Sequence, residues 1–212
     1  RRSSDLTLCY NVKRQRANVN YDIVTGRRHL INSSLFVNGY PEIENFITAL
    51  KKQSLLRTGA PYSHELVGRE RMRITNELRN KGFYYFGANN LAFELDTNQV
   101  VHNDHHSHNK YLDVDVIFQH TKDSIELEQY HFNKVVVFYN FDEVKSLEDQ
   151  LPIRKFENDI LFQAHDEYVS SQIVDKKIFI RPGNLFSQQE YDKTLLLLND
   201  LGVFKYVRIQ IQ

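Results

Sequence analysis

The most suggestive chemistry in this 212-residue sequence is a histidine-rich stretch, HNDHHSH, near its middle. Its potential metal ligands lie close together: His102, Asp104, His105, His106 and His108. Imidazoles at such short spacings can bind Zn²⁺ or Ni²⁺. No cysteine accompanies them, and the stretch lies between two expected strands. We therefore interpret it as a solvated polar loop, with adventitious metal binding and a functional metal site as the alternatives.

Two carboxylates follow the histidines. Asp113 and Asp115 could in principle do acid–base work together. However, they alternate with Leu112, Val114 and Val116, which predicts that they lie on the solvent face of a strand. We expect no catalysis from this pair.

The remaining reactive or charged groups also have structural interpretations. Cys9 alternates with apolar strand positions, and as the only cysteine it cannot form an internal disulfide. An expected helix carries arginines interleaved with glutamates, which predicts a mixed-charge surface: Arg69, Arg71, Arg73 and Arg79 with Glu65, Glu70 and Glu77. No phosphate-binding glycine loop, metalloprotease helix or nucleophile elbow is present. The sequence therefore predicts a protein that is not an enzyme and needs no cofactor.

Composition limits the class of protein. Apolar residues make up 41% and charged residues 25%, which is typical of a soluble globular chain of one or two domains. The 27 basic and 27 acidic residues balance, which argues against nucleic-acid binding. No apolar run approaches the roughly 20 residues of a spanning helix. The chain begins RRSSDLT without Met, so we expect a mature or excised piece.

The first half of the chain predicts one α+β unit. Alternating apolar residues predict strands at 6–12, 19–23, 31–37, 91–95 and 112–118. In the third of these, Ile31, Ser33, Leu35 and Val37 are expected to share one face. Two helices should separate the third and fourth strands: one with an apolar stripe from 43 to 50, preceded by Pro41, and one from 64 to 81, ended by Gly82.

The second half predicts a related unit. A strand is expected at 135–139. The pattern of residues 140–177 is weak, with a short helix near 169–177. The chain then continues with a turn, a helix and a further strand, 204–211.

The end of the second unit repeats a stretch of the first. Aligning GAPYSHELVGRERMRITNELRNKGFYYF with GNLFSQQEYDKTLLLLNDLGVFKYV matches Gly59 to Gly183 and the pair Tyr62-Ser63 to Phe186-Ser187. Leu78 precedes Gly82 by the same interval that separates Leu198 from Gly202. The copies differ by about one helical turn, so the helix face is kept.

Helix-start signals recur in both copies. Ser63 and Ser187 are expected N-caps, each with a hydrophobic staple, and Glu190 completes a capping box in the second copy alone. The second helix should bury one stripe: Tyr191, Thr194, Leu195, Leu198 and Leu201. Leu196 and Leu197 lie outside it, which predicts burial against a further surface. Such repetition of a supersecondary unit favours a modular array over a single enzyme fold.

The duplicated pattern, G-x-x-aromatic-Ser, helix, Leu-x-x-x-Gly-x-aromatic, resembles the POTRA (polypeptide-transport-associated) domain. The stretches LNDLGVFKYVRIQI and LRNKGFYYFGANNLAFELD look most like outer-membrane β-barrel assembly factors of the BamA/TamA kind, in a Bacteroidetes-like branch. The resemblance covers residues from about 20 to 212. It implies tandem periplasmic modules, each a three-stranded mixed sheet on two helices in the order β-α-α-β-β.

The resemblance also implies boundaries and partners. Residues 1–17 would end a preceding module, 18–122 would form the first POTRA domain, and 129–212 would form a second one lacking its last strand. Partners would be unfolded outer-membrane protein clients, accessory assembly subunits and a C-terminal membrane barrel outside this chain, at the periplasmic side of the bacterial outer membrane.

Unpaired sheet edges are the expected working surfaces. By resemblance, the candidate edge residues are Phe83, Tyr84, Tyr85, Phe86, Leu91, Phe93, Leu95, Phe204, Tyr206, Val207, Ile209 and Ile211. The function expected is a scaffold that docks clients by strand addition. The alternatives are a POTRA-like module of a cell-division or two-partner-secretion machine, and an enzyme that uses the histidine stretch.

Overall fold

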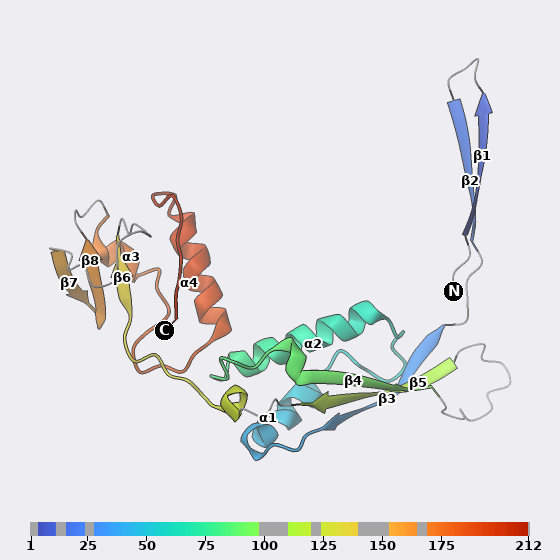
Figure 1. Cartoon of the computed structure of the whole chain (residues 1–212), viewed down its shortest axis with the longest axis horizontal. Helices are drawn as coiled ribbons and strands as arrows, with labels where there is room; N and C mark the ends of the chain where they lie inside the picture. The colour runs from blue at the N-terminus through green and yellow to red at the C-terminus, as the bar shows by residue number, and fades with distance from the viewer. Residues whose placement is uncertain are drawn as a thin grey trace.

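The computed structural model of the chain describes residues 4–11, 16–23, 28–97, 110–119, 124–139, 153–164 and 169–211. It is an α+β structure with two three-stranded mixed sheets and associated helices (Figure 1). The expected α+β class with three-stranded mixed sheets is confirmed, but the expected order β-α-α-β-β holds for the first sheet only, and the second sheet does not lack its last strand. We call residues 28–119 the first module and residues 130–211 the second module. The histidine-rich stretch, 102–108, lies outside the described residues.

The first two strands form a sheet of their own. β1 (Ser4–Asn11) pairs antiparallel with β2 (Arg16–Ile23) over the full length of both strands. The expected first strand therefore has a partner within this chain. Its assignment to a preceding module stays a prediction.

The first module follows the expected element order. Its elements are β3 (His29–Val37), α1 (Pro41–Lys52), α2 (His64–Arg79), the short 3₁₀ helix η2 (Ala88–Asn90), β4 (Leu91–Asp96) and β5 (Lys110–Phe118). The strand order is β3-β5-β4, with β5 parallel to β3 and antiparallel to β4. The central strand β5 therefore comes last in the chain.

One face of β3 departs from the expectation. Ile31 is fully buried, but Leu35 is 53% exposed and Val37 is also exposed, while Phe36 is buried instead. The pairing of β3 with β5 shifts register between Ile31 and Ser34. An irregularity of this kind reverses the inward-outward alternation of a strand. The prediction that Ile31, Leu35 and Val37 share one face is therefore wrong.

Both helices of the first module begin as expected. Pro41 occupies the first turn of α1, and the Ser63 hydroxyl accepts a hydrogen bond from the Leu66 amide at the start of α2, at 3.1 Å. α2 ends at Arg79, two residues before the expected end. Gly82 follows with φ of +99°, a conformation that favours glycine.

A buried carboxylate fastens α2 to the loop after α1. Glu70 is fully buried and accepts hydrogen bonds from the Ser54 hydroxyl, the Leu55 amide and the Arg73 guanidinium, at 2.8 to 3.0 Å. Arg73 also donates to the Leu50 carbonyl. Burial alone would raise the pKa of Glu70, but these hydrogen bonds outweigh it and hold that pKa below its usual value.

The second module builds a sheet of the same shape from a different part of the chain. Its elements, after the short 3₁₀ helix η3 (Ser124–Leu127), are β6 (Val136–Phe138), β7 (Ile153–Glu157), β8 (Ile160–Ala164), α3 (Ser171–Asp175) and α4 (Gln188–Asp200). The order is β6-β8-β7, with β8 parallel to β6 and antiparallel to β7. The second and third strands of this sheet, β7 and β8, thus come from a hairpin before α3, within the stretch where the sequence pattern is weak.

A tight turn and an ion pair hold this hairpin in place. Asn158 and Asp159 have φ of +44° and +69°, as a two-residue hairpin turn requires. Asp175 on α3 accepts from Asn158 and from Arg181. Burial would raise the pKa of Asp175, but these two partners keep it below its usual value. The contacts fix the hairpin turn against α3.

The last segment of the second module does not form the expected strand. Within the described residues, 203–211 has no partner in a strand ladder. It packs by side chains instead, because Phe204, Val207 and Ile209 contact the second core. The prediction of a strand at 204–211 is therefore wrong.

α4 confirms the expected cap and stripe. The Ser187 hydroxyl accepts from the Glu190 amide, and Thr194 and Leu198 are buried. Leu196, by contrast, is 68% exposed, so its expected burial is not found in the described part of the chain. None of the described helices is both long and apolar enough to cross a membrane.

Candidate docking surfaces

In both modules the segment before the second helix makes the same set of backbone hydrogen bonds. In the first module the backbone hydrogen bonds are Gly59 N to Ile31 O, Ile31 N to Ala60 O and Tyr62 N to His29 O. In the second module they are Gly183 N to Phe132 O, Phe132 N to Asn184 O and Phe186 N to Tyr130 O. Gly59 and Gly183 have φ of +81° and +83°. The repeat seen in the sequence is therefore a repeat of backbone path.

In the first module, the segment before α2 covers part of one edge of the sheet. Residues 59–62 lie against the start of β3 and form a bridge between Leu30 and Pro61. They therefore occupy part of the outer edge of β3. Among the described strands, none pairs with the outer side of β4. β4 is the better candidate for adding a further strand.

The hydrogen-bond pattern shows which residues face that edge. The Gln119 amide donates to the Asn90 carbonyl at 2.8 Å, just before the first residue of β4. In an antiparallel pair the residues that bond to the neighbour alternate along the strand. Ala92 and Glu94 therefore direct their backbone groups to β5. Phe93 and Leu95 direct their N–H and C=O groups outward.

The joint between the modules is an aromatic cluster. The rings of Tyr84 and Phe186 lie 4.9 Å apart, edge to face, and the Arg79 guanidinium lies 5.4 Å from each of them. Arg79 Nε also donates to Gln188 Oε1 at 2.8 Å. The end of α2 thus lies against the start of α4 (Figure 1), where the Asn80 side chain accepts from the backbone amide of α4's second residue.

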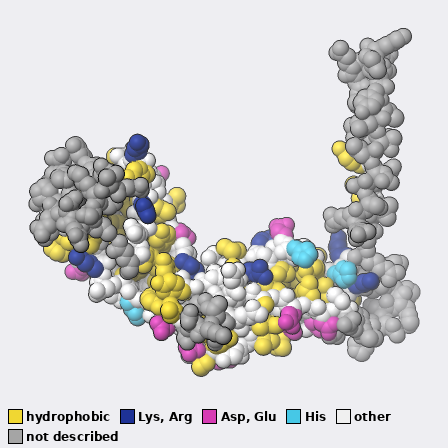
Figure 2. All heavy atoms as spheres, in the orientation of Figure 1, with side chains coloured by type: hydrophobic (Ala, Val, Ile, Leu, Met, Phe, Trp, Pro, Cys, Tyr) yellow, Lys and Arg dark blue, Asp and Glu magenta, His cyan; other side chains and the backbone are white. Residues whose placement is uncertain are grey.

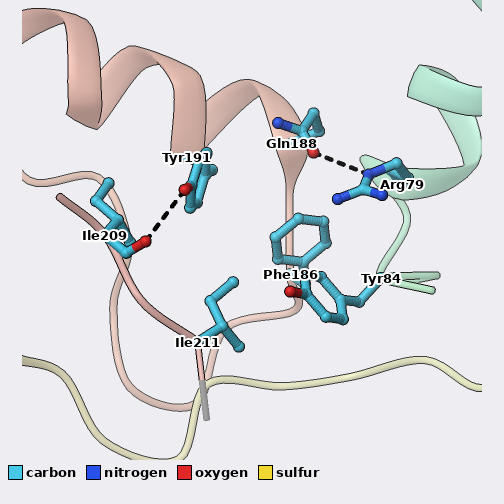
Figure 3. Close-up of a pocket in the computed structure, with 7 residues that line it drawn as sticks. All are labelled: Arg79, Tyr84, Phe186, Gln188, Tyr191, Ile209 and Ile211. Atoms are coloured by element: carbon cyan, nitrogen blue, oxygen red, sulfur yellow. Dashed lines mark hydrogen bonds between the residues drawn. The ribbon is translucent and has the colours of Figure 1, made fainter. Parts of the chain in front are cut away.

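A cavity of about 160 Å³ lies beside this joint (Figure 3). It is lined by Arg79, Tyr84, Phe186, Gln188, Tyr191, Ile209 and Ile211. The Tyr191 hydroxyl donates to the Ile209 carbonyl at 3.3 Å, which fastens residues 203–211 to α4. The Arg79 guanidinium at the cavity already contacts both aromatic rings and Gln188.

Comparison with known proteins identifies the fold. No protein-family model and no curated protein matches the sequence. Among solved structures, POTRA3-5 of BamA from Haemophilus influenzae is similar over 99% of this chain, with a TM-score of 0.52 and 12% identity. The chain has the POTRA fold. It spans 65% of the length of that structure.

Two further solved structures were found with lower superposition scores. The N-terminal domain of Omp85 from Thermosynechococcus elongatus has a TM-score of 0.28 at 11% identity, covering 89% of this chain and 92% of that one. POTRA1-3 of Omp85 from Anabaena has a TM-score of 0.32 at 13% identity, covering 99% and 68%.

The expected edge residues divide into core and surface once placed in the POTRA modules. Phe83, Phe86 and Leu91 are buried in the first core, and residues 83–86 lie outside the strands of the sheet. Their physical role is packing. Tyr84 belongs to the joint, and Tyr85 is exposed beside it.

Of the expected edge residues, only those of β4 lie in an edge strand of a described sheet. Leu95 is 40% exposed, and Phe93 is half-buried. In the second POTRA module, Tyr206 and Ile211 are exposed and the other expected residues pack against the core. Their role in partner binding stays a prediction.

The second POTRA module has a margin that the sequence analysis missed. β7 is the outer strand of the order β6-β8-β7, and Phe156 on it is 72% exposed. The signal available in the sequence was the alternation in IRKFE followed by Asn-Asp, a hairpin-type turn before ILF. The charged residues around it hid that pattern.

Figure 2 shows basic, acidic and apolar side chains mixed over the visible face of the coloured residues. This agrees with the zero net charge of the whole sequence.

Proposed function

We propose that the chain is a non-enzymatic, periplasmic scaffold region of an outer-membrane protein assembly or translocation factor, and that it docks extended client segments on the edge of β4. The observation that carries the proposal is the outward N–H and C=O groups of Phe93 and Leu95. The fold shared with BamA POTRA3-5 supports the setting. Accessory assembly subunits are the further partners we propose.

Strand addition suits a factor with many clients. Main-chain hydrogen bonds provide affinity with little dependence on the sequence of the added segment. Unfolded outer-membrane strands offer the same alternating backbone donors and acceptors. β4 is short, at six residues, which favours transient rather than permanent pairing.

The proposal is tested with the whole 212-residue chain and a capped nine-residue peptide of alternating Val and Thr. The Leu95→Pro variant removes one outward N–H and should weaken binding at least about tenfold, as measured by fluorescence anisotropy of labelled peptide. The matched Leu95→Ala variant keeps that N–H and should bind within about twofold of the original chain. Equal binding by the Pro variant would overturn the proposal.

A second arm changes the peptide and leaves the protein intact. N-methylation of every second residue blocks one backbone edge of the peptide, and N-methylation of both sets blocks both edges. We expect the singly blocked peptide to bind and the doubly blocked peptide not to bind. Binding of the doubly blocked peptide would show that backbone pairing is not the mode of recognition.

A further inference from the structure

Arg71 on α2 lies over the margin of the first sheet. Its guanidinium carbon is 5.2 Å from the centre of the Phe93 ring, and Phe93 is one of the two residues whose backbone faces the open edge of β4. The guanidinium therefore lies above the edge strand β4, next to the position that an added strand would take.

The guanidinium of Arg71 has unused hydrogen-bonding capacity. Its Nε atom is buried and has no hydrogen-bond partner among the described residues. Its neighbours along the helix are paired, Arg69 with Glu65 and Arg73 with Glu70. The ion pairs found in the described residues do not include Arg71. A buried N–H without a partner is uncommon and calls for an acceptor.

The helix surface one turn before Arg71 is open. Gly68 lies one turn earlier on the same face of α2, and a Cβ placed there would meet no atom within 4 Å. Space of this kind lets a side chain from an added strand rise toward the helix.

We propose that Arg71 selects client segments that carry a carboxylate, from an Asp or Glu side chain, on the helix side of the added strand. The planar guanidinium binds a carboxylate through two parallel N–H groups, including the unpartnered Nε. Arg71 is thus a specificity-determining residue of the β4 edge. The inference rests on the strand addition proposed above and names a feature of its client.

The test compares two capped nine-residue peptides of alternating Thr and Val that differ only at the central residue, Glu or Gln. We expect the chain to bind the Glu peptide about fivefold more tightly, a modest factor because Arg71 is partly solvated. The preference should shrink as NaCl is raised.

Two protein variants test whether Arg71 is the residue that causes the preference for the Glu peptide. Arg71→Gln should bind both peptides equally well, while Arg69→Gln removes the same charge from the same helix and should keep the preference. Amide NMR spectra of both variants verify the fold. Equal binding of the two peptides by the original chain would overturn the selection by Arg71 and leave strand addition standing, whereas failure of both peptides to bind would overturn both proposals.

Discussion

The two modules reach the same sheet arrangement by different routes along the chain. In each, an entry strand pairs in parallel with a central strand, and a third strand closes the sheet antiparallel. The central strand β5 follows both helices, whereas β8 precedes both. The shared layout is therefore fixed by backbone pairing and core packing, and the connections can vary.

Each module also has a buried carboxylate, and the two carboxylates hold different connections. Glu70 fastens the second helix to the loop after the first helix. Asp175 fastens the short helix α3 to the turn of the β7–β8 hairpin. Each carboxylate stabilises the connection that is particular to its module.

The largest effect should come from removing the carboxylate of the first module. Glu70→Ala leaves Arg73 and the Leu55 amide without their partner in a buried site, and should lower the free energy of unfolding by about 3 kcal/mol. Asp175→Ala should cost less, about 2 kcal/mol, because Arg181 is more exposed than Arg73 and can be solvated. Urea unfolding measures both.

The control for this pair is Glu70→Gln, which keeps an acceptor for Ser54 and Leu55 and should lose less than Glu70→Ala. If Asp175→Ala proved the more damaging change, the hairpin connection would be the more critical one.

A smaller effect should come from the glycines that end the long helices. An alanine Cβ at Gly82, with φ of +99°, would lie 2.8 Å from Leu185 Cδ2, whereas at Gly202, with φ of +66°, it would meet nothing within 4 Å. Gly82→Ala should therefore cost about 2 kcal/mol and Gly202→Ala about 1 kcal/mol in the free energy of unfolding.

These two variants also separate strain from contact. Thermal unfolding of both variants shows whether the contact of the added Cβ with Leu185 costs stability beyond the backbone strain at positive φ. Equal losses would mean that Leu185, which is at the surface, moves aside without cost.

The smallest effect expected is on acid stability. The pKa values of Glu70 and Asp175 are both lowered in the folded chain, so each group adds stability above its unfolded pKa, near 4.5 and 3.8, and loses it as the pH falls through the folded value. Stability should therefore decline below about pH 4.5. Glu70→Gln should flatten that decline, as followed by circular dichroism.

An unchanged acid profile in Glu70→Gln would show that other groups govern the decline. Asp175→Asn is the matched variant for the second module. Its effect should begin at lower pH, because the ordinary pKa of Asp is lower.

Much of the fold was predictable where local signals are strong. Ser63 and Ser187 mark helix starts, and Gly59 and Gly183 mark the same turn, because these residue types satisfy local backbone needs. These four positions revealed the repeat without any long-range information.

The wrong predictions concern segments whose structure depends on pairing with residues far away in the sequence. The reversal of faces between Ile31 and Phe36 depends on the register with β5, which the local alternation does not encode. Residues 204–211 alternate like a strand, but the β7–β8 hairpin from earlier in the chain already supplies the strand that pairs with β6. Residues 83–86 look strand-like because they are aromatic, and they are buried for packing.

The edge of β4 was only partly predictable. Leu91, Phe93 and Leu95 were expected on a strand, but which backbone groups face outward follows from the pairing with β5. The position of Arg71 over Phe93 depends on how α2 crosses the sheet, which the sequence pattern alone does not give.

The most direct measurement is amide hydrogen exchange by NMR on the whole chain with and without the capped Val-Thr peptide. We predict that the amides of Phe93 and Leu95 become protected when the peptide is at saturation, while those of Ala92 and Glu94, already bonded to β5, do not change. Unchanged exchange at Phe93 and Leu95 in the presence of bound peptide would contradict strand addition at β4.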